Sequence, residues 1–294
     1  MARPLSRCQE IERSIVKKFR KALFNPFIEA VKRYSLIEEG DKIAVCISGG
    51  KDSMLLAKLM ELLKRYGEQK FELVFLAMDP GYNEENRARI LENAKTLELP
   101  LTMFSSEIFA AADSVEKSPC YLCARMRRGH LYAKARELGC NKIALGHHLN
   151  DVIETTLIGM FYGAQLQGMM PKIRSQNFEG MELIRPLYCI KEDDIIAWAR
   201  YNGLEFIRCA CRVTARTEAE EGCSKRQEMK ELVNALKKQD AQIEDNLFTA
   251  LHAVCLDTFP GLKAGGKKYS FDELYENKKT DSCEVNPKVW TKKN

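Results

Sequence analysis

The sequence lacks any long apolar run. No stretch of about 18 uncharged apolar residues, the length that a membrane helix needs, occurs among the 294 residues. Charged residues are spread through positions 1–20, which leaves no apolar core for a signal peptide. Neither charge sign dominates, because 46 Lys and Arg stand against 41 Asp and Glu, a net charge of +5. We therefore expect a cytoplasmic protein with no membrane contact, for which a polyanionic partner is permitted but not required.

The sequence also lacks the features of a disulfide-stabilised secreted protein. Its 11 cysteines are an odd number, and no secretion signal accompanies them. Disulfides are rare in the reducing cytosol, so the cysteines favour metal or redox chemistry over a disulfide framework. We expect Cys46, Cys140, Cys189 and Cys255, which lie in apolar or helical contexts, to be buried structural thiols.

No internal repeat is present, and short β-rich runs alternate with helical periodicity between residues 41 and 208. The pattern predicts strands at 43–47, 71–77, 101–104 and 142–145, and helices at 54–66, 84–97, 128–138 and 151–161. Such alternation is typical of a parallel sheet covered on both faces. The fold class is therefore α/β, with a Rossmann-like domain over residues 41–208.

Helical segments flank this domain on both sides. Residues 1–40 form an N-terminal helical region whose polar face carries Lys and Arg, either as a solvated surface or as a nucleic-acid-facing one. Residues 209–261 contain a cysteine-bearing loop followed by C-terminal helices. Residues 262–294 are Lys-rich with few large apolar residues, so this basic tail is expected to be poorly ordered.

A glycine-rich loop stands between the first strand and its helix. It consists of Ser48, Gly49, Gly50, Lys51, Asp52 and Ser53. Paired glycines let the backbone approach a ligand closely, and the helix start presents N–H groups to an anion. The serine hydroxyls and Lys51 add donors, and Asp52 is suited to help hold Mg²⁺ on a pyrophosphate. The sequence therefore predicts a phosphate-binding loop.

This hexapeptide resembles the PP-loop of the ATP pyrophosphatases and differs from the Gly-x-x-x-x-Gly-Lys-Ser/Thr loop of other ATPases. The resemblance implies an α/β domain that binds ATP with Mg²⁺ and cleaves it between the α- and β-phosphates. A substrate oxygen is then adenylated, and a nucleophile displaces AMP. The resemblance also implies that Ala77 and Asp79, at the end of the second strand, lie beside the adenosine.

A Cys-x-x-Cys pair, Cys120 and Cys123, precedes an Arg-rich helix, and further cysteines follow at Cys209, Cys211 and Cys223. The spacing alone fits zinc, an iron–sulfur cluster or a dithiol. Cys211 would complete a four-thiolate zinc site with a cramped Cys-x-Cys pair. Three thiolates on a [4Fe–4S] cluster would instead leave one iron open to carry sulfide.

Four segments together, residues 120–128, 145–155, 160–163 and 184–187, resemble the tRNA 2-thiocytidine synthetases. The resemblance implies that Cys120, Cys123 and Cys209 hold a [4Fe–4S] cluster, with Cys211 or Cys223 as alternatives for the third ligand. It implies that ATP adenylates O2 of the cytidine at position 32 of the tRNA anticodon loop, and that sulfide then displaces AMP. The sulfur donor would be a cysteine desulfurase or free sulfide, and the protein a homodimer.

The same resemblance assigns residues around the loop. Gly146 and His148 at one strand end and Arg185 at another would join the nucleotide site. Asn150 stands where the family usually has an Asp, so the role of that motif would rest on Asp151. The residues expected to act in catalysis are Lys51, Asp52, Asp151, Arg127 and Arg128.

Three alternative functions stay open at this point. A PP-loop thiotransferase could act on a different tRNA base or on a small molecule. A PP-loop amide ligase would use an amine nucleophile and would not need the cysteine set. A non-catalytic zinc or iron–sulfur RNA-binding module would not need an intact phosphate loop.

Overall fold

The computed structural model describes residues 4–106, 119–207 and 224–277, with the side chains of 119–125 and 276–277 left aside. The chain divides into two compact units, Met1–Gln239 and Asp240–Asn294, which are described separately. The boundary falls inside the segment 209–261, which the sequence groups into one region.

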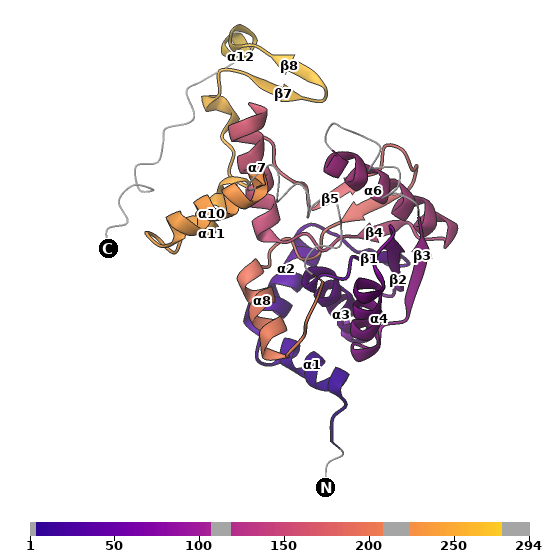
Figure 1. Ribbon diagram of the computed structural model, residues 1–294. Helices are drawn as coiled ribbons and strands as arrows, with labels where there is room; N and C mark the ends of the chain where they lie inside the picture. Colours follow the sequence, from indigo (N-terminus) through magenta and orange to yellow (C-terminus); the bar gives the residue numbers. More distant parts are fainter. Residues whose placement is uncertain (1–3, 107–118, 208–223, 278–294) are drawn as a thin grey trace. The chain divides into compact units, whose positions relative to one another are not determined.

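A six-stranded sheet forms the centre of the first unit, with strand order β3-β2-β1-β4-β6-β5 (Figure 1). Its parallel strands are β1 (Lys42–Ile47), β2 (Glu72–Asp79), β3 (Leu101–Ser105), β4 (Lys142–Ala144) and β6 (Glu182–Ile184). The antiparallel edge strand is β5 (Lys172–Arg174). The expected α/β parallel sheet is confirmed. Strand β5 was not predicted, and β6 is the strand that the sequence analysis implied by placing Arg185 at a strand end, without giving its range.

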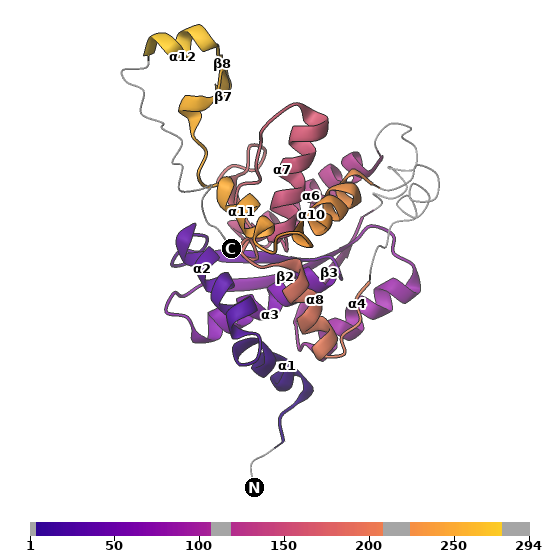
Figure 2. The same ribbon diagram turned by 90° about the vertical axis from the view of Figure 1, so that its left-hand side faces the viewer.

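Helices cover both faces of this sheet. Their bounds are α3 (Lys51–Tyr66), α4 (Glu84–Thr96), α6 (Pro119–Glu137), α7 (Leu149–Gly163), α8 (Glu192–Tyr201) and α10 (Lys225–Lys237). Figure 2 shows α3, α4 and α8 on one side of the sheet and α6 and α7 on the other. The start of α6 lies well before residue 128, where the sequence pattern placed it, so that prediction of the helix boundary was wrong.

The N-terminal region is helical, as predicted, but in three pieces. They are α1 (Arg7–Val16), a π-helix (Arg20–Phe24) and α2 (Asn25–Arg33). Ser6 and Gln9 form a capping box that starts α1. Pro26 lies in the first turn of α2, a position where its missing N–H costs nothing. The buried apolar residues of these pieces pack the region onto the domain.

The second unit contains short elements only. They are α11 (Ile243–Ala250), a 3₁₀ turn (Leu256–Thr258), the hairpin β7 (Leu262–Ala264) and β8 (Lys267–Tyr269), and α12 (Phe271–Asn277). The tail therefore has regular structure as far as residue 277, which its composition did not predict. Over the described ranges, no helix combines the length and the apolar character needed to cross a membrane.

The cysteines expected to be structural have mixed outcomes. Cys46 and Cys140 are buried free thiols, as predicted, and burial raises the pKa of each, that of Cys46 to about 12. Cys189 is a free thiol that is only partly buried. Cys255 is disulfide-bonded and partly exposed, so the prediction of a buried thiol was wrong there.

Candidate nucleotide site

The glycine-rich loop between β1 and α3 has a backbone that only glycine fits. Gly49 has φ +85°, and a Cβ built there would lie 2.6 Å from Ile90 Cγ1 and 2.7 Å from Ile207 Cδ1. Both the dihedral angle and the close approach exclude a larger residue. The loop is therefore held tightly against α4 while its other side stays open.

The end of β4 approaches the same loop from the neighbouring strand. A Cβ on Gly146 would lie 3.1 Å from both Asp52 C and Ser53 N, closer than ordinary packing. Gly146 thus allows the segment after β4 to lie directly on the first turn of α3. The carboxyl ends of adjacent parallel strands are where open α/β sheets bind ligands.

The two serines of the loop bind each other. Ser53 Oγ lies 3.1 Å from Ser48 N and 3.2 Å from Ser48 Oγ, and it donates to Gly50 O at 3.0 Å. These bonds fix the curvature of the loop. Gly50, the N-cap of α3, supplies no side-chain acceptor. The positive end of α3 therefore faces the site without a capping side chain.

Lys51 connects the loop to α8. Its Nζ lies 3.2 Å from Asp52 Oδ1 and 3.0 Å from Glu192 Oε1. Burial alone would lower the pKa of Lys51, but the two carboxylates raise it, so the ammonium keeps its proton. Burial would raise the pKa of Glu192, but Lys230 at 2.6 Å and Lys51 lower it to about 2.

His148 and Asp151 form the start of α7 beside the loop. Asp151 N donates to His148 Nδ1 at 3.4 Å, and His148 N donates to Asp151 Oδ2 at 3.0 Å, a capping box with an unusual histidine cap. His148 is buried, and its Nε2 lies 3.9 Å from Asp52 Oδ1. Asp151 also forms an ion pair with Arg226 of α10. The two histidine-motif residues are thus brought against the phosphate loop, as predicted.

Asp52 carries a buried carboxylate oxygen beside the loop. Its Oδ1 makes an ion pair with Lys51 at 3.2 Å without a hydrogen bond, and burial raises the pKa of the carboxyl. Within the described ranges, no group of three or more His, Cys, Asp or Glu is arranged to hold a metal ion. Mg²⁺ usually binds one or two carboxylates together with substrate phosphates rather than a complete protein cage. Asp52 fits that mode of binding.

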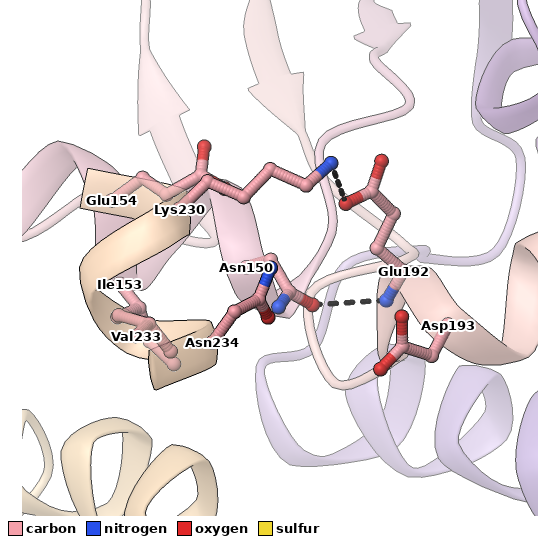
Figure 3. Close-up of a pocket in the computed structure, with 8 residues that line it drawn as sticks. All are labelled: Asn150, Ile153, Glu154, Glu192, Asp193, Lys230, Val233 and Asn234. Atoms are coloured by element: carbon pink, nitrogen blue, oxygen red, sulfur yellow. Dashed lines mark hydrogen bonds and ion pairs between the residues drawn. The ribbon is translucent and has the colours of Figure 1, made fainter. Parts of the chain in front are cut away.

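A small pocket lies next to these residues, between α7, α8 and α10 (Figure 3). Asn150 Oδ1 accepts from Glu192 N at 2.9 Å, so this residue ties α7 to the first turn of α8. Glu154 is buried on the same helix, 3.7 Å from Arg226. Burial and the nearby charges of Asp151 and Glu192 raise the pKa of Glu154 to about 7.

The end of β2 forms another edge of the site. Ala77 pairs with Ile47, the last residue of β1, so it lies beside the start of the loop; its contact with the adenosine stays a prediction. Asp79 is buried, and its Oδ1 accepts from Gly81 N at 2.9 Å and Tyr82 N at 2.8 Å. Asp79 therefore holds the turn that follows β2.

The arginines of α6 and β6 occupy different positions. Arg127 donates to Tyr82 Oη at 3.2 Å, and Arg128 is exposed. Arg185 directly follows β6 and is buried; it donates to Met170 O, while its Nε has no partner. Burial and the nearby charge of Arg128 lower the pKa of Arg185 to about 10. The structure therefore places Arg185 near the strand ends, where the sequence predicted it, and gives it a bond to the loop before β5.

The comparisons with known proteins agree with this geometry. A family model described as a PP-loop domain matches residues 13–212. The tRNA-cytidine(32) 2-sulfurtransferase of Syntrophotalea carbinolica is 40% identical over 228 residues, 76% of this chain and 85% of that protein. The one from Geobacter metallireducens is 36% identical over 239 residues, 80% of this chain and 90% of that protein. This chain belongs to the PP-loop family of tRNA-cytidine(32) 2-sulfurtransferases.

A solved structure shares the fold at lower identity. The U34-tRNA thiolase NcsA from Methanococcus maripaludis, with its [4Fe-4S] cluster, gives a TM-score of 0.61 at 18% identity. The match covers 78% of this chain and 77% of that one. The likeness supports the PP-loop architecture. The expected family and fold class are both confirmed.

Only two of the cysteines proposed as ligands lie among the residues that the structure describes. Cys120 and Cys123 are in the first turn of α6, three positions apart, which places both on one side of the helix backbone. Cys209, Cys211 and Cys223 lie outside the described residues. The choice of a third ligand therefore stays a prediction for this PP-loop protein.

Sequence reasoning missed three charged residues that pair with Lys51, with Asp151 or with each other beside the loop. Glu192, Arg226 and Lys230 come from α8 and α10, far along the chain. Arg226 and Lys230 are four residues apart on α10, so they share one helix face, but this spacing is common on solvated helices. The sequence around Arg226 and Lys230 does not indicate that they pair with Asp151 and Glu192.

Proposed function

We propose that this chain is an ATP-dependent tRNA sulfurtransferase that forms 2-thiocytidine at position 32 of the anticodon loop. The observation that carries the proposal is the phosphate loop, whose close packing at Gly49 and Gly146 sets the uncapped start of α3 beside Lys51. The substrate is proposed from the names of the relatives that are 36–40% identical to this chain.

The nucleotide would bind along the carboxyl ends of β1, β2 and β4. The N–H groups at the start of α3 and the ammonium of Lys51 would receive the phosphates. Asp52 would hold Mg²⁺ on them through its buried Oδ1, once Lys51 turns to the phosphates. Ala77 and the turn held by Asp79 would contact the adenosine, and the segment from Gly146 to His148 would close the other side.

The reaction would proceed in two displacements, the first at the α-phosphorus of ATP and the second at C2 of the cytidine. O2 of the base attacks the α-phosphate, the bond to the β-phosphate breaks, and pyrophosphate leaves. Sulfur then attacks C2, the C2–O2 bond breaks, and AMP leaves with the oxygen. Lys51 and one of Arg127 or Arg128 would stabilise the charge that develops on the phosphates. Asp151 would keep His148 oriented toward Asp52.

The cysteine set would hold a [4Fe–4S] cluster through Cys120, Cys123 and Cys209. When bound, the cluster would carry the sulfide that is transferred, on an iron that no cysteine binds. The one-turn spacing of Cys120 and Cys123 at the start of α6 suits two thiolates on one site. We also propose tRNA as the macromolecular partner, a cysteine desulfurase or free sulfide as the sulfur source, a homodimer, and a cytoplasmic location.

Metal content tests the cluster directly. We would measure iron, acid-labile sulfide and zinc on anaerobically purified protein, comparing the wild type, Cys209→Ala and Cys189→Ala. About four irons and four sulfides per chain, lost only in Cys209→Ala, are expected for a cluster with three cysteine ligands. Zinc in place of iron, or iron retained in Cys209→Ala, would contradict the assignment.

The acceptor needs a separate measurement. Protein incubated with tRNA, ATP, Mg²⁺ and sulfide should convert one cytidine to 2-thiocytidine, detected by mass spectrometry of digested tRNA, with AMP formed in equal amount. The Lys51→Met variant serves as the control. A thiolated base other than cytidine 32 would favour the alternative PP-loop thiotransferase.

A further inference from the structure

Helix α10 reaches the nucleotide site with two cations on one face. Arg226 pairs with Asp151, and Lys230 Nζ lies 2.6 Å from Glu192 Oε2. The other oxygen of Glu192, Oε1, lies 3.0 Å from Lys51 Nζ. Lys230 and Lys51 therefore share one carboxylate, one on each oxygen. Figure 3 shows Lys230 meeting Glu192 at the edge of the pocket.

The charges around the loop explain why this sharing matters. Asp52, Asp151 and Glu192 lie on or next to the phosphate loop and are acidic, yet the proposed ligand is itself a polyanion. Like charges a few ångströms apart repel strongly in a partly buried site. The α10 cations neutralise two of these carboxylates, which leaves Lys51 able to turn from Glu192 to a phosphate.

We propose that Lys230 and Arg226 are positioning residues for ATP: they neutralise Glu192 and Asp151, and so release Lys51 to bind the phosphates. This role rests on the proposed function, because it requires ATP at the phosphate loop. Neither residue needs to touch the nucleotide. Without Lys230, Lys51 is the one ion-pair partner left to Glu192 among the described residues, so when Lys51 turns to the phosphates Glu192 presents an uncompensated charge to them.

The chain offers a matched control on the same helix. Lys237 also joins α10 to α8, through Asp193 at 3.0 Å, one residue beyond Glu192. The side chain of Asp193 is 74% exposed, whereas that of Glu192 is 12% exposed and reaches Lys51. Lys237→Met therefore removes an ion pair between the same two helices without changing the charge beside Lys51.

The test measures binding of the α,β-methylene analogue of ATP with Mg²⁺ by calorimetry, without tRNA and without turnover. Lys230→Met should weaken binding about tenfold, while Lys237→Met stays within about twofold of the wild type. The double variant Lys230→Met/Glu192→Gln should return to within about threefold, since the excess negative charge is gone. Arg226→Ala should also weaken binding, and Arg226→Lys should recover most of it.

A merely structural role for α10 would give a different pattern. Equal losses in Lys230→Met and Lys237→Met, or no recovery in the double variant, would overturn the proposal, provided that thermal unfolding shows both variants folded. Wild-type protein that does not bind the analogue would overturn it together with ATP as a ligand. The expected binding pattern without any thiolation of tRNA would support it and contradict the proposed function alone.

Discussion

Two lysines of α3 illustrate two uses of a buried positive charge. Lys58 is 1% exposed, and its Nζ binds Glu61 Oε2 at 2.6 Å, Glu12 Oε1 at 2.9 Å and Leu97 O at 3.0 Å. Cys8 Sγ also lies 3.4 Å from this Nζ. An ammonium has three donors, so these four partners leave none of them free. Lys51, at the start of the same helix, has a side chain that is 25% exposed, and its two carboxylate partners are Asp52, beside it in the loop, and Glu192, at the start of α8.

The difference shows which ion cluster supports the fold and which is ready for a ligand. Glu12, the partner of Lys58, also binds Arg65 at 2.8 Å, so this cluster joins α1 to α3 from both sides. One of the partners of Lys58 is a backbone carbonyl, which cannot leave. The partners of Lys51 are side chains, and Glu192 has a second cation in Lys230. Phosphates can therefore replace these carboxylates at small cost.

The largest expected effect follows from replacing Lys51. Lys51→Met should lower the rate of AMP formation roughly a hundred- to a thousandfold, because the charge that develops on the phosphates loses its nearest cation. The melting temperature should change little, since Glu192 keeps Lys230. Parallel assays of AMP release and thermal unfolding test both halves. If Lys51→Met has a much lower melting temperature but forms AMP at the wild-type rate, Lys51 supports the fold rather than the reaction.

Lys58→Met should give the opposite result. Removing one partner of a buried ion pair leaves uncompensated charge, and we expect the free energy of unfolding to fall by about 3 kcal/mol. Arg65 still neutralises Glu12, which keeps the loss near the lower end of the usual range. Urea denaturation measures the change. The rate of AMP formation per folded molecule should stay at the wild-type value, and a large drop would place Lys58 in the site.

The phosphate loop and the parallel sheet could be predicted because their signals are local. Residues 48–53 lie in consecutive positions between a strand and a helix, and the strand–helix alternation was readable from short windows. Gly146 and His148 directly follow a predicted strand, and the structure brings both against the first turn of α3; their contact with the nucleotide stays a prediction. Ala77 was likewise placed beside the loop, since parallel strands bring their carboxyl ends together.

The rest of the site depends on contacts between residues that are far apart in the sequence. Glu192 meets Lys51 and Lys230 across α3, α8 and α10, and only the packed structure brings these helices together. Asn150 departs from the family pattern, yet its side chain binds Glu192 N, a contact made by tertiary packing. Strand β5 was missed because Lys172–Arg174 has one apolar residue between two charged ones, which is too little to show a strand pattern.

A pair of glycines sharpens the contrast between loop and scaffold. Gly49 and Gly40 have similar dihedral angles, φ +85° and +81°, but a Cβ on Gly40 would meet nothing within 4 Å. Alanine is strained at both positions, and only at position 49 does it also collide with Ile90. We expect Gly49→Ala to cost about 2 kcal/mol more unfolding free energy than Gly40→Ala.

The same two variants should also differ in nucleotide affinity. Moving the loop away from Ile90 would shift the N–H groups at the start of α3, so Gly49→Ala should bind the ATP analogue at least about tenfold more weakly. Gly40→Ala precedes β1, away from the loop, and should bind normally. Equal stability losses in urea together with equal affinities would show that the packing of Gly49 against α4 has no role in the site.

The smallest effect compares two buried glutamates in the two clusters. Burial alone would raise the pKa of Glu12, but Arg65 and Lys58 lower it from its ordinary value of 4.5. Its carboxylate therefore stabilises the fold above pH 4.5, and this stabilisation is lost as the pH falls through the lowered pKa. Burial raises the pKa of Glu154 to about 7, so native Glu154 holds a proton that the unfolded chain releases above about 4.5. That residue makes the protein less stable as the pH rises from about 4.5 to 7.

Glutamine substitutions should separate these two cases. Glu154→Gln should gain roughly 1–3 kcal/mol relative to the wild type between pH 4.5 and 8, because it has no carboxyl to ionise. Glu12→Gln should instead be less stable than the wild type at pH 7, with a difference that shrinks below pH 4.5. Urea denaturation of the three proteins across this range measures both trends. If both variants are less stable than the wild type at pH 7, the ionised carboxylate of Glu154 stabilises the fold as that of Glu12 does. The two clusters would then not differ in the way that the comparison of Lys51 and Lys58 requires.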